Sequence, residues 1–133
     1  MTVASELAII TLISCALCPD RLLKKDYITK LYGVSGTHIS QVVHRLGVEG
    51  FLKTVRGRSG GFALARPSET IIIGDVIRVF QGKIVRDKFL IERENHAFFN
   101  VMQRADNIWE IGVQSFYSVM DQVTLADLVP SSA

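Results

Sequence analysis

The chain has 133 residues, a length that suits one domain with an appended element and argues against a two-domain enzyme. Apolar residues make up 48% and charged residues 21%, which excludes a disordered chain. No apolar run approaches the ~20 residues that cross a bilayer, and the apolar segment 2–17 lacks the basic start of a secretory signal and contains Glu6. Cys15 and Cys18 suit reduced thiols better than a disulfide framework, so a cytoplasmic protein without a membrane span is predicted.

The net charge of +2 is unevenly distributed along the sequence. Between Arg21 and Arg66 there are nine basic and only two acidic residues, a net charge of +7, whereas the rest of the chain carries −5. Such a concentration of positive charge is typical of a surface that meets a polyanion. Scattered lysines and arginines would merely solvate a surface, but here the excess coincides with a motif.

The first part of the sequence predicts three helices. Residues 4–17 are apolar nearly all round, which indicates a buried helix that ends at Pro19. A short second helix is predicted over residues 26–32, and Gly33 follows it where a left-handed residue can end a helix. A third helix follows Ser35, the predicted N-cap, and turns these residues to one face: Ile39, Val42, Val43 and Leu46. Two helices joined by a tight, glycine-containing turn form a helix-turn-helix.

A β-hairpin is predicted directly after the third helix. Residues 51–55 and 62–65 alternate between apolar and polar, and they flank the glycine-rich, basic segment RGRSGG at residues 56–61. A hairpin in this place is the wing of a winged helix. Residues 68–73 are predicted as another short extended stretch, followed by a helical pattern over residues 76–80 that Gly82 closes.

The last part of the sequence predicts a long helix with an apolar seam. Residues 83–95 are charged and weakly patterned, and we interpret them as a linker. The expected division is a winged helix-turn-helix DNA-binding domain at residues 1–82, followed at residues 83–133 by this linker, a long dimerisation helix and a C-terminal tail. From Phe98 onward apolar residues are spaced alternately by four and three, a seven-residue repeat typical of helix-helix seams. The repeat consists of Phe98, Met102, Ala105, Trp109, Gly112, Phe116, Val119 and Val123.

This seam predicts a homodimer. A helix of ~28 residues extends about 42 Å at 1.5 Å per residue, which is longer than a domain of this size can cover. Pairing with a second copy is therefore expected, although a core helix of the monomer is the alternative. A second stripe beside the seam could dock on the chain's own amino-terminal domain, and it consists of Val101, Ile108, Ile111 and Met120.

The outward face of the third helix and the wing tip predict contacts with double-stranded DNA. A helix fits the major groove of B-DNA, where glutamine suits adenine and arginine suits guanine. Arginines on a glycine-rich wing can enter the minor groove or clamp a phosphate. The predicted DNA-binding residues are Ser35, Thr37, His38, Gln41, His44, Arg45, Arg56, Arg58, Ser59 and Gly60. Among them Thr37, His38 and Gln41 lie where base edges are normally reached, and Arg45 is expected at a phosphate.

The run VRGRSGGFALARPSETIIIGDVIRVFQG, residues 55–82, resembles the wing and following helix of bacterial winged-helix repressors of the IscR and NsrR type, the Rrf2 family. Upstream, YGVSGTHISQVVHRLGVEGFL is similar to the recognition helix of this family, and FYSVMDQVTLADLV to the end of its NsrR branch. The resemblance implies a mainly helical winged helix-turn-helix with a long dimerisation helix. It also implies a homodimeric repressor that binds a palindromic operator and changes its affinity when an effector binds.

The sequence departs from this family at the ligands of the iron-sulfur cluster. Sensors of the family hold the cluster with three cysteines in the loop before the long helix, whereas this chain has no cysteine after Cys18. Glu6 lies roughly where the NsrR branch has an acidic ligand, but one carboxylate without thiolates does not make a cluster site. The sequence therefore predicts no iron-sulfur cluster and no other metal or cofactor.

Two alternative functions stay open beside a DNA-binding transcription regulator. The C-x-x-C spacing of Cys15 and Cys18 suits a thiol-based redox sensor, although cysteines in an apolar helix are more often core residues. A winged helix that binds a protein partner through its long helix is the other alternative, but it would not need a segment of charge +7. Sequence motifs of common enzyme classes, such as G-x-S-x-G, the P-loop and H-E-x-x-H, are missing, so no enzyme is predicted. The sequence identifies neither the operator nor an effector, small molecule or protein.

Overall fold

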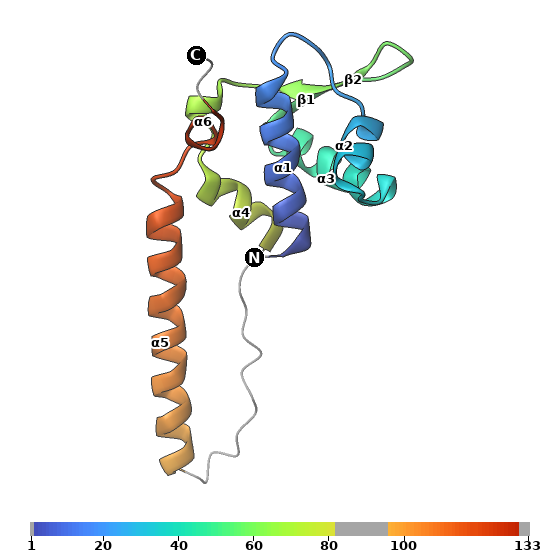
Figure 1. The fold of residues 1–133 in the computed structure, drawn as a ribbon. Coiled ribbons are helices and arrows are strands. Elements are labelled where there is room, and N and C mark those ends of the chain that lie inside the picture. The colour runs from blue at the N-terminus through green and yellow to red at the C-terminus, as the bar shows by residue number, and fades with distance from the viewer. Residues whose placement is uncertain (1, 82–95, 131–133) are drawn as a thin grey trace.

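The computed structural model describes residues 2–81 and 96–130, in which a hairpin lies at one edge of a group of helices (Figure 1). The elements are α1 (Val3–Leu17), α2 (Lys25–Tyr32), α3 (Gly36–Val48), β1 (Leu52–Val55), β2 (Gly61–Leu64), η1 (Ser68–Thr70), α4 (Ile73–Gln81), α5 (His96–Met120) and α6 (Leu125–Leu128). The mainly helical fold with one two-stranded antiparallel hairpin is therefore confirmed. Within the described residues no helix is both long and apolar enough to cross a bilayer.

Helix α1 lies at the centre of the fold. It packs against α3, α4, α6 and β2, and Leu7, Ala8 and Leu12 on it are almost completely buried. A helix buried on several sides must also satisfy its polar side chains. The buried hydroxyl of Thr11 donates to the carbonyl of Leu7 at 2.7 Å, and Ser14 and Ser5 donate in the same way to carbonyls in the preceding turn. This explains how a helix with hydroxyls on its buried face can form the core.

Helices α2 and α3 form the predicted helix-turn-helix. Gly33 ends α2 in the left-handed conformation, with φ of 66°. The side-chain oxygen of Ser35 accepts a hydrogen bond from the backbone N–H of His38 at 3.4 Å, which confirms Ser35 as the N-cap of α3. Helix α3 then buries Ile39, Val42 and Leu46 against the core, and this leaves the opposite face of α3 free for a ligand.

The hairpin is held at its base by a third segment. Strands β1 and β2 pair with Leu52 opposite Leu64 and Val55 opposite Gly61. Leu23, in the connection between α1 and α2, exchanges two backbone hydrogen bonds with Phe62 of β2, at 2.9 and 2.8 Å. Because Leu52 and Phe62 are also buried, the base of the wing is part of the core and only its tip projects.

The segment between the hairpin and α4 differs from the prediction. Residues 68–73 were expected to be extended, but Ser68–Thr70 form the 3-10 turn η1 and α4 begins at Ile73. The hydroxyl of Thr70 donates to the carbonyl of Pro67 at 2.7 Å, which favours the turn. Only Ile72 keeps a strand-like contact, an isolated bridge to Thr124.

Helix α5 ends earlier than the heptad pattern predicts, at Met120 instead of Val123. The backbone turns at Asp121, and the carbonyl of Val123 accepts a hydrogen bond from the N–H of Ile73 at 2.9 Å. Leu125 of the following α6 is fully buried, so the tail packs back against η1 and α1. Residues 82–95, the predicted linker, and the side chains of Phe98 and Met102 lie outside the described part of the chain.

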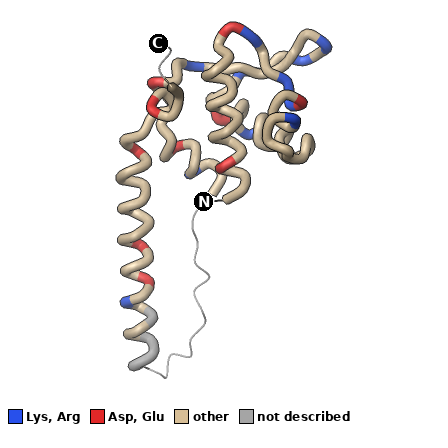
Figure 2. The backbone as a smooth tube through the Cα atoms, in the orientation of Figure 1, with Lys and Arg blue, Asp and Glu red and all other residues tan. Residues whose placement is uncertain are grey.

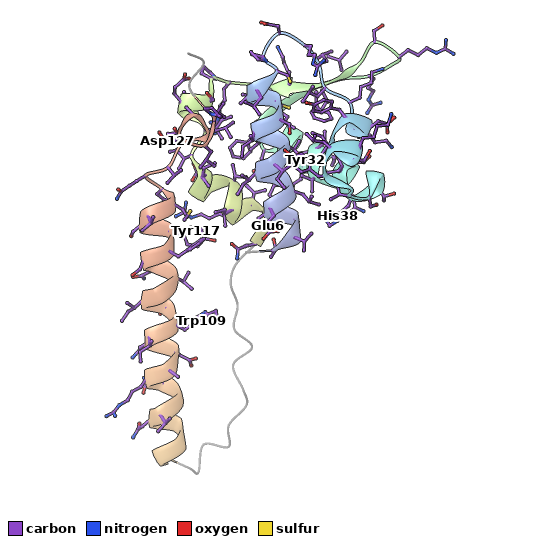
Figure 3. All side chains as sticks on the ribbon, in the orientation of Figure 1. Glu6, Tyr32, His38, Trp109, Tyr117 and Asp127 are labelled. Carbon is purple, nitrogen blue, oxygen red and sulfur yellow. The ribbon has the colours of Figure 1, made fainter. Side chains whose placement is uncertain are left out.

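The C-terminal end of the long helix α5 packs against α4. The rest of α5 projects away from the other helices (Figure 1). The second stripe does not dock on the chain's own domain as expected, because Val101, Ile108 and Ile111 are at least 60% exposed; Met120, in the last turn, does reach the core. Trp109 extends from the middle of α5 into open space, whereas Tyr117 points toward α4 (Figure 3).

The described side chains of the predicted seam fall into two groups. Those on the projecting part of α5 are exposed, namely Trp109, Gly112, Phe116 and Val119, and Ala105 is half-buried. Val123 lies beyond the helix and packs against the core of its own chain. Its apolar character is thus explained within the monomer, whereas the exposed apolar side chains on α5 have no such explanation.

Candidate nucleic-acid interface

An open groove of about 950 Å³ lies between α3 and the hairpin. Four cationic side chains line it, Lys24, Lys25, Lys53 and Arg56, together with His44 of α3. No carboxylate is among its lining residues in the described part of the chain. A concave surface that carries only positive charge concentrates anions in front of it, so this groove suits the phosphates of a nucleic acid.

Helix α3 presents one polar face beside the groove. Thr37, Gln41, His44 and Arg45 are exposed there, and His38 is half-buried. The guanidinium of Arg45 forms an ion pair with Glu49 one turn later, with 3.1 Å between Nη2 and Oε1. Such exposed pairs contribute only about 0.3–0.5 kcal/mol, so the pair orients Arg45 without withdrawing it from a phosphate.

The wing tip carries the other part of the predicted set. Arg56, Arg58 and Ser59 are exposed at the tip, where Figure 2 shows basic residues, whereas α5 carries mainly acidic ones. Gly60 is instead buried in the turn: its N–H donates to the carbonyl of Gly57 at 3.0 Å, and a Cβ at Gly60 would overlap the carbonyl of Val55. The backbone can therefore make this tight turn only with glycine at position 60.

The structure adds three cations that the sequence analysis counted but did not assign to the site: Lys24, Lys25 and Lys53. The Nζ of Lys24 also donates to the carbonyl of Arg58 at 2.5 Å, which connects the α1–α2 segment to the wing tip. The charge excess between Arg21 and Arg66 was a signal for these residues. Lys53 follows from its place on β1, whereas the placement of Lys24 and Lys25 depends on the pairing of Leu23 with Phe62, which no helical or strand pattern in the sequence reveals.

The two cysteines lie at the end of α1, and neither of them lines the groove. Burial, with a smaller contribution from the neighbouring Cys18, raises the pKa of the Cys15 thiol to about 12. The Sγ of Cys18 is half-buried and accepts a hydrogen bond from Arg21 at 3.6 Å. Among the described residues no three His, Cys, Asp or Glu side chains are grouped so that they could hold a metal ion.

Comparison with known proteins agrees with this geometry. Residues 1–131 match the Rrf2 family, described as iron-dependent transcriptional regulators. IscR of T. potens is similar with 26% identity and a TM-score of 0.74, over 96% of this chain and 84% of that one. CymR of Staphylococcus aureus is similar with 25% identity and a TM-score of 0.76, over 99% of each chain. CymR of B. subtilis, described as a global cysteine regulator, shares the fold with 24% identity and a TM-score of 0.69, over 100% of this chain and 98% of that one.

The match covers nearly the whole chain, and the solved structures share its winged helix-turn-helix and its C-terminal helix. The charged residues that line the groove beside α3 are all cations, which suits the phosphates of DNA. The chain belongs to the Rrf2 family of DNA-binding transcriptional regulators.

Proposed function

We propose that the protein is a homodimeric repressor that binds a palindromic operator. Helix α3 reads base edges in the major groove, and the wing tip with Arg56 and Arg58 contacts phosphates or enters the minor groove. The observation that carries this proposal is the groove between α3 and the wing, whose charged lining residues are all cations. A winged helix that binds only proteins has no need of such a groove.

The exposed apolar face of α5 supports the dimer. Trp109 is 53% exposed and Val119 59%, and both are positions of the seven-residue repeat. Large apolar side chains grouped on one projecting helix are typical of a surface that a partner covers. With a second copy as that partner, the two α3 helices would enter successive major grooves about 34 Å apart.

The residues of this chain do not fit the iron-sulfur cluster that the family description implies. A cluster is held mainly by cysteine thiolates, and the chain has two cysteines, of which Cys15 is buried and protonated. Glu6 lies in the first turn of α1 (Figure 3), whereas Cys15 lies in its last turn and Cys18 is its C-cap. Cys15 lies nine positions after Glu6, about 13 Å along the helix, so these two groups of one chain cannot bind the same cluster. We therefore propose that regulation proceeds without the cluster.

The same observation weighs against a thiol sensor that uses both cysteines. A reactive cysteine needs exposure and a lowered pKa, and Cys15 has neither. This leaves the effector of the proposed repressor to be found among other small molecules or proteins.

The proposal is tested with duplexes selected from a random library by the wild-type protein. Arg56→Ala is expected to weaken binding to selected and scrambled duplexes alike, because a phosphate contact carries no sequence information. Gln41→Ala is expected to weaken mainly the selected duplex, by about 1–3 kcal/mol. Arg104→Ala, which removes an exposed arginine from α5, is the matched control and should change neither affinity. Equal affinities of wild type and Arg56→Ala would remove the wing from the mechanism.

The dimer is tested by a charge on the seam. Phe116→Asp places a carboxylate on the exposed apolar face of α5 and is expected to give monomers with much weaker operator binding. Analytical ultracentrifugation at several protein concentrations measures the change. A sedimentation profile identical to that of the wild type would refute the assignment of the seam.

A further inference from the structure

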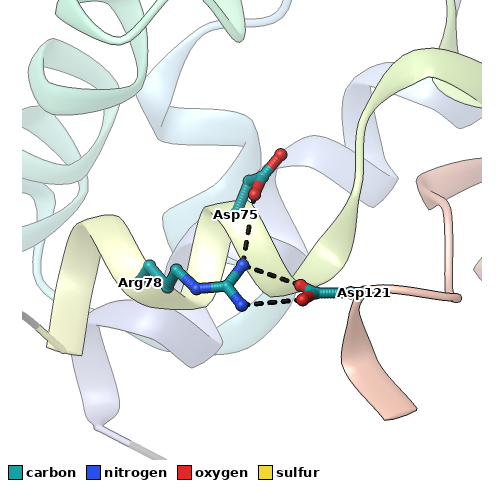
Figure 4. A network of polar contacts seen from close by, with 3 residues as sticks. All are labelled: Asp75, Arg78 and Asp121. Atoms are coloured by element: carbon teal, nitrogen blue, oxygen red, sulfur yellow. Dashed lines mark hydrogen bonds and ion pairs between the residues drawn. The ribbon is translucent and has the colours of Figure 1, made fainter. Parts of the chain in front are cut away.

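Helix α5 is joined to α4 by a group of charged residues that we call the clamp: Asp75 and Arg78 on α4, and Asp121 directly after α5 (Figure 4). The guanidinium of Arg78 donates two parallel hydrogen bonds to the carboxylate of Asp121, Nη1 to Oδ1 and Nη2 to Oδ2, both at 2.7 Å. Asp75 accepts a third from Nη1 at 3.2 Å. A two-point contact between planar groups fixes their relative orientation as well as their distance.

The surroundings of the clamp fix it further. The guanidinium carbon of Arg78 lies 4.3 Å from the ring centre of Tyr117, in the last turn of α5. Gly74 provides the space for the carboxylate, because a Cβ at this position would overlap Oδ1 of Asp121. Any side chain at position 74 would therefore displace Asp121 from Arg78.

The clamp lies where a small rotation has a large effect. Helix α5 has 25 residues, which corresponds to about 37 Å at 1.5 Å per residue. Near its middle Ile108 and Trp109 are more than half exposed, so that part of the helix receives no support from the head, residues 2–81. A rotation of about 5° at the clamp would move the far end of α5 by about 3 Å.

We propose that Arg78 is a positioning residue for DNA binding, because the clamp sets the angle between α5 and the head and thereby the separation of the two recognition helices in the dimer. Helix α4, which carries Arg78, lies on the side of the head that faces α5, away from the wing (Figure 1). It acts without touching DNA. This inference depends on the homodimer proposed above, because only a dimer has two recognition helices to space.

The direct test measures the distance between the two α3 helices. A spin label at Gln41→Cys, in a chain that also carries Cys15→Ala and Cys18→Ala, reports this distance in the free dimer by pulsed electron paramagnetic resonance. With Arg78 intact we expect one narrow distribution. Arg78→Gln is expected to broaden it or shift it by about 3 Å or more, and Asp121→Asn to act in the same direction. Arg104→Gln, the matched control on α5, should leave it unchanged.

A second measurement needs no label. Adding one base pair between the two half-sites of the selected operator moves them by about 3.4 Å and rotates them by about 35°. The wild type should lose affinity for the lengthened operator, whereas Arg78→Gln should discriminate less between the two lengths, by about threefold or more. A variant that is merely less stable would lose affinity for both lengths in proportion. If Arg78→Gln does not fold, Asp121→Asn takes its place in both measurements.

The outcomes separate this inference from the proposed function. A clamp variant that is dimeric and keeps both the wild-type distance distribution and the wild-type spacing preference overturns the role of the clamp alone. A wild-type protein that sediments as a monomer and gives no distance between labels overturns the homodimer, and the role of the clamp with it.

Discussion

Replacing Arg58 by alanine should reduce the salt dependence of DNA binding by a calculable amount. Arg58 is exposed at the wing tip, and its backbone carbonyl accepts a hydrogen bond from Lys24. This bond positions the tip and leaves the Arg58 side chain exposed to solvent. If the Arg58 guanidinium neutralises one phosphate, each protomer of Arg58→Ala releases one counterion fewer on binding than a wild-type protomer does. The affinity should therefore depend less steeply on salt in Arg58→Ala than in the wild type.

The magnitude follows from the dimer. Each phosphate contact contributes about −0.9 to the slope of log K against log salt, so two lost contacts reduce the slope by about 1.8. Between about 50 mM and about 200 mM salt, the deficit of Arg58→Ala relative to the wild type should then shrink about tenfold. Fluorescence anisotropy of a labelled duplex, titrated at four or five salt concentrations, measures both slopes.

The controls make this result specific. Arg104→Ala removes the same charge from α5, away from the groove, and should keep the wild-type slope. A monomeric variant such as Phe116→Asp, further changed by Arg58→Ala, should lose only about 0.9 of slope, because one contact disappears instead of two. An Arg58→Ala slope equal to that of the wild type would refute the placement of the wing on the phosphates.

Three further predictions concern stability and reactivity. Leu125→Ala should lower the free energy of unfolding by about 2–5 kcal/mol, because Leu125 is fully buried. Leu128→Ala, on the exposed side of α6, should change it by no more than about 0.5 kcal/mol. Urea titration measures both values, and similar losses in the two variants would contradict the packing of residues 121–128. Hydrogen bonds from Arg78 lower the pKa of Asp121, so its stabilising effect is present above the ordinary carboxyl pKa of about 3.9 and is lost as the pH falls through the lower folded value. The difference in urea midpoint between wild type and Asp121→Asn should accordingly shrink as the pH falls below about 4, and a difference that is undiminished at pH 2 would contradict this. With a pKa of about 12, the Cys15 thiol is almost entirely protonated at neutral pH, so iodoacetamide should modify Cys18 first and Cys15 only after unfolding. Peptide mass spectrometry measures the two rates, and equal rates in the folded protein would refute the burial of Cys15.

The local features of the fold could be predicted because each depends on neighbouring residues. Ser35 as N-cap, Gly33 as the end of α2 and the glycine-rich hairpin are all written in short stretches of sequence. The heptad pattern failed at Val123 for a different reason. An apolar side chain at that position satisfies both a helix seam and the core of the head, and periodicity cannot distinguish the two.

The candidate site could be predicted only where it follows a single element. The exposed face of α3 and the arginines of the wing follow from helical periodicity and from the turn. Lys24 and Lys25 reach the groove because the segment before α2 pairs with β2, through Leu23 and Phe62. Such pairings are tertiary contacts, and one sequence contains no direct signal of them.

The packing of the tail has a consequence for biosynthesis. The head receives Leu125 into its core, and the backbone of Ile71 and Ile73 pairs with residues 125 and 123, which follow some fifty positions later. When the ribosome has translated the wing and α4, the core of the head therefore still lacks Leu125. The core is completed only after the last residues of the chain have been made. Long-range closure of this kind slows folding, so the newly made chain exposes apolar side chains of the head until its last residues have packed.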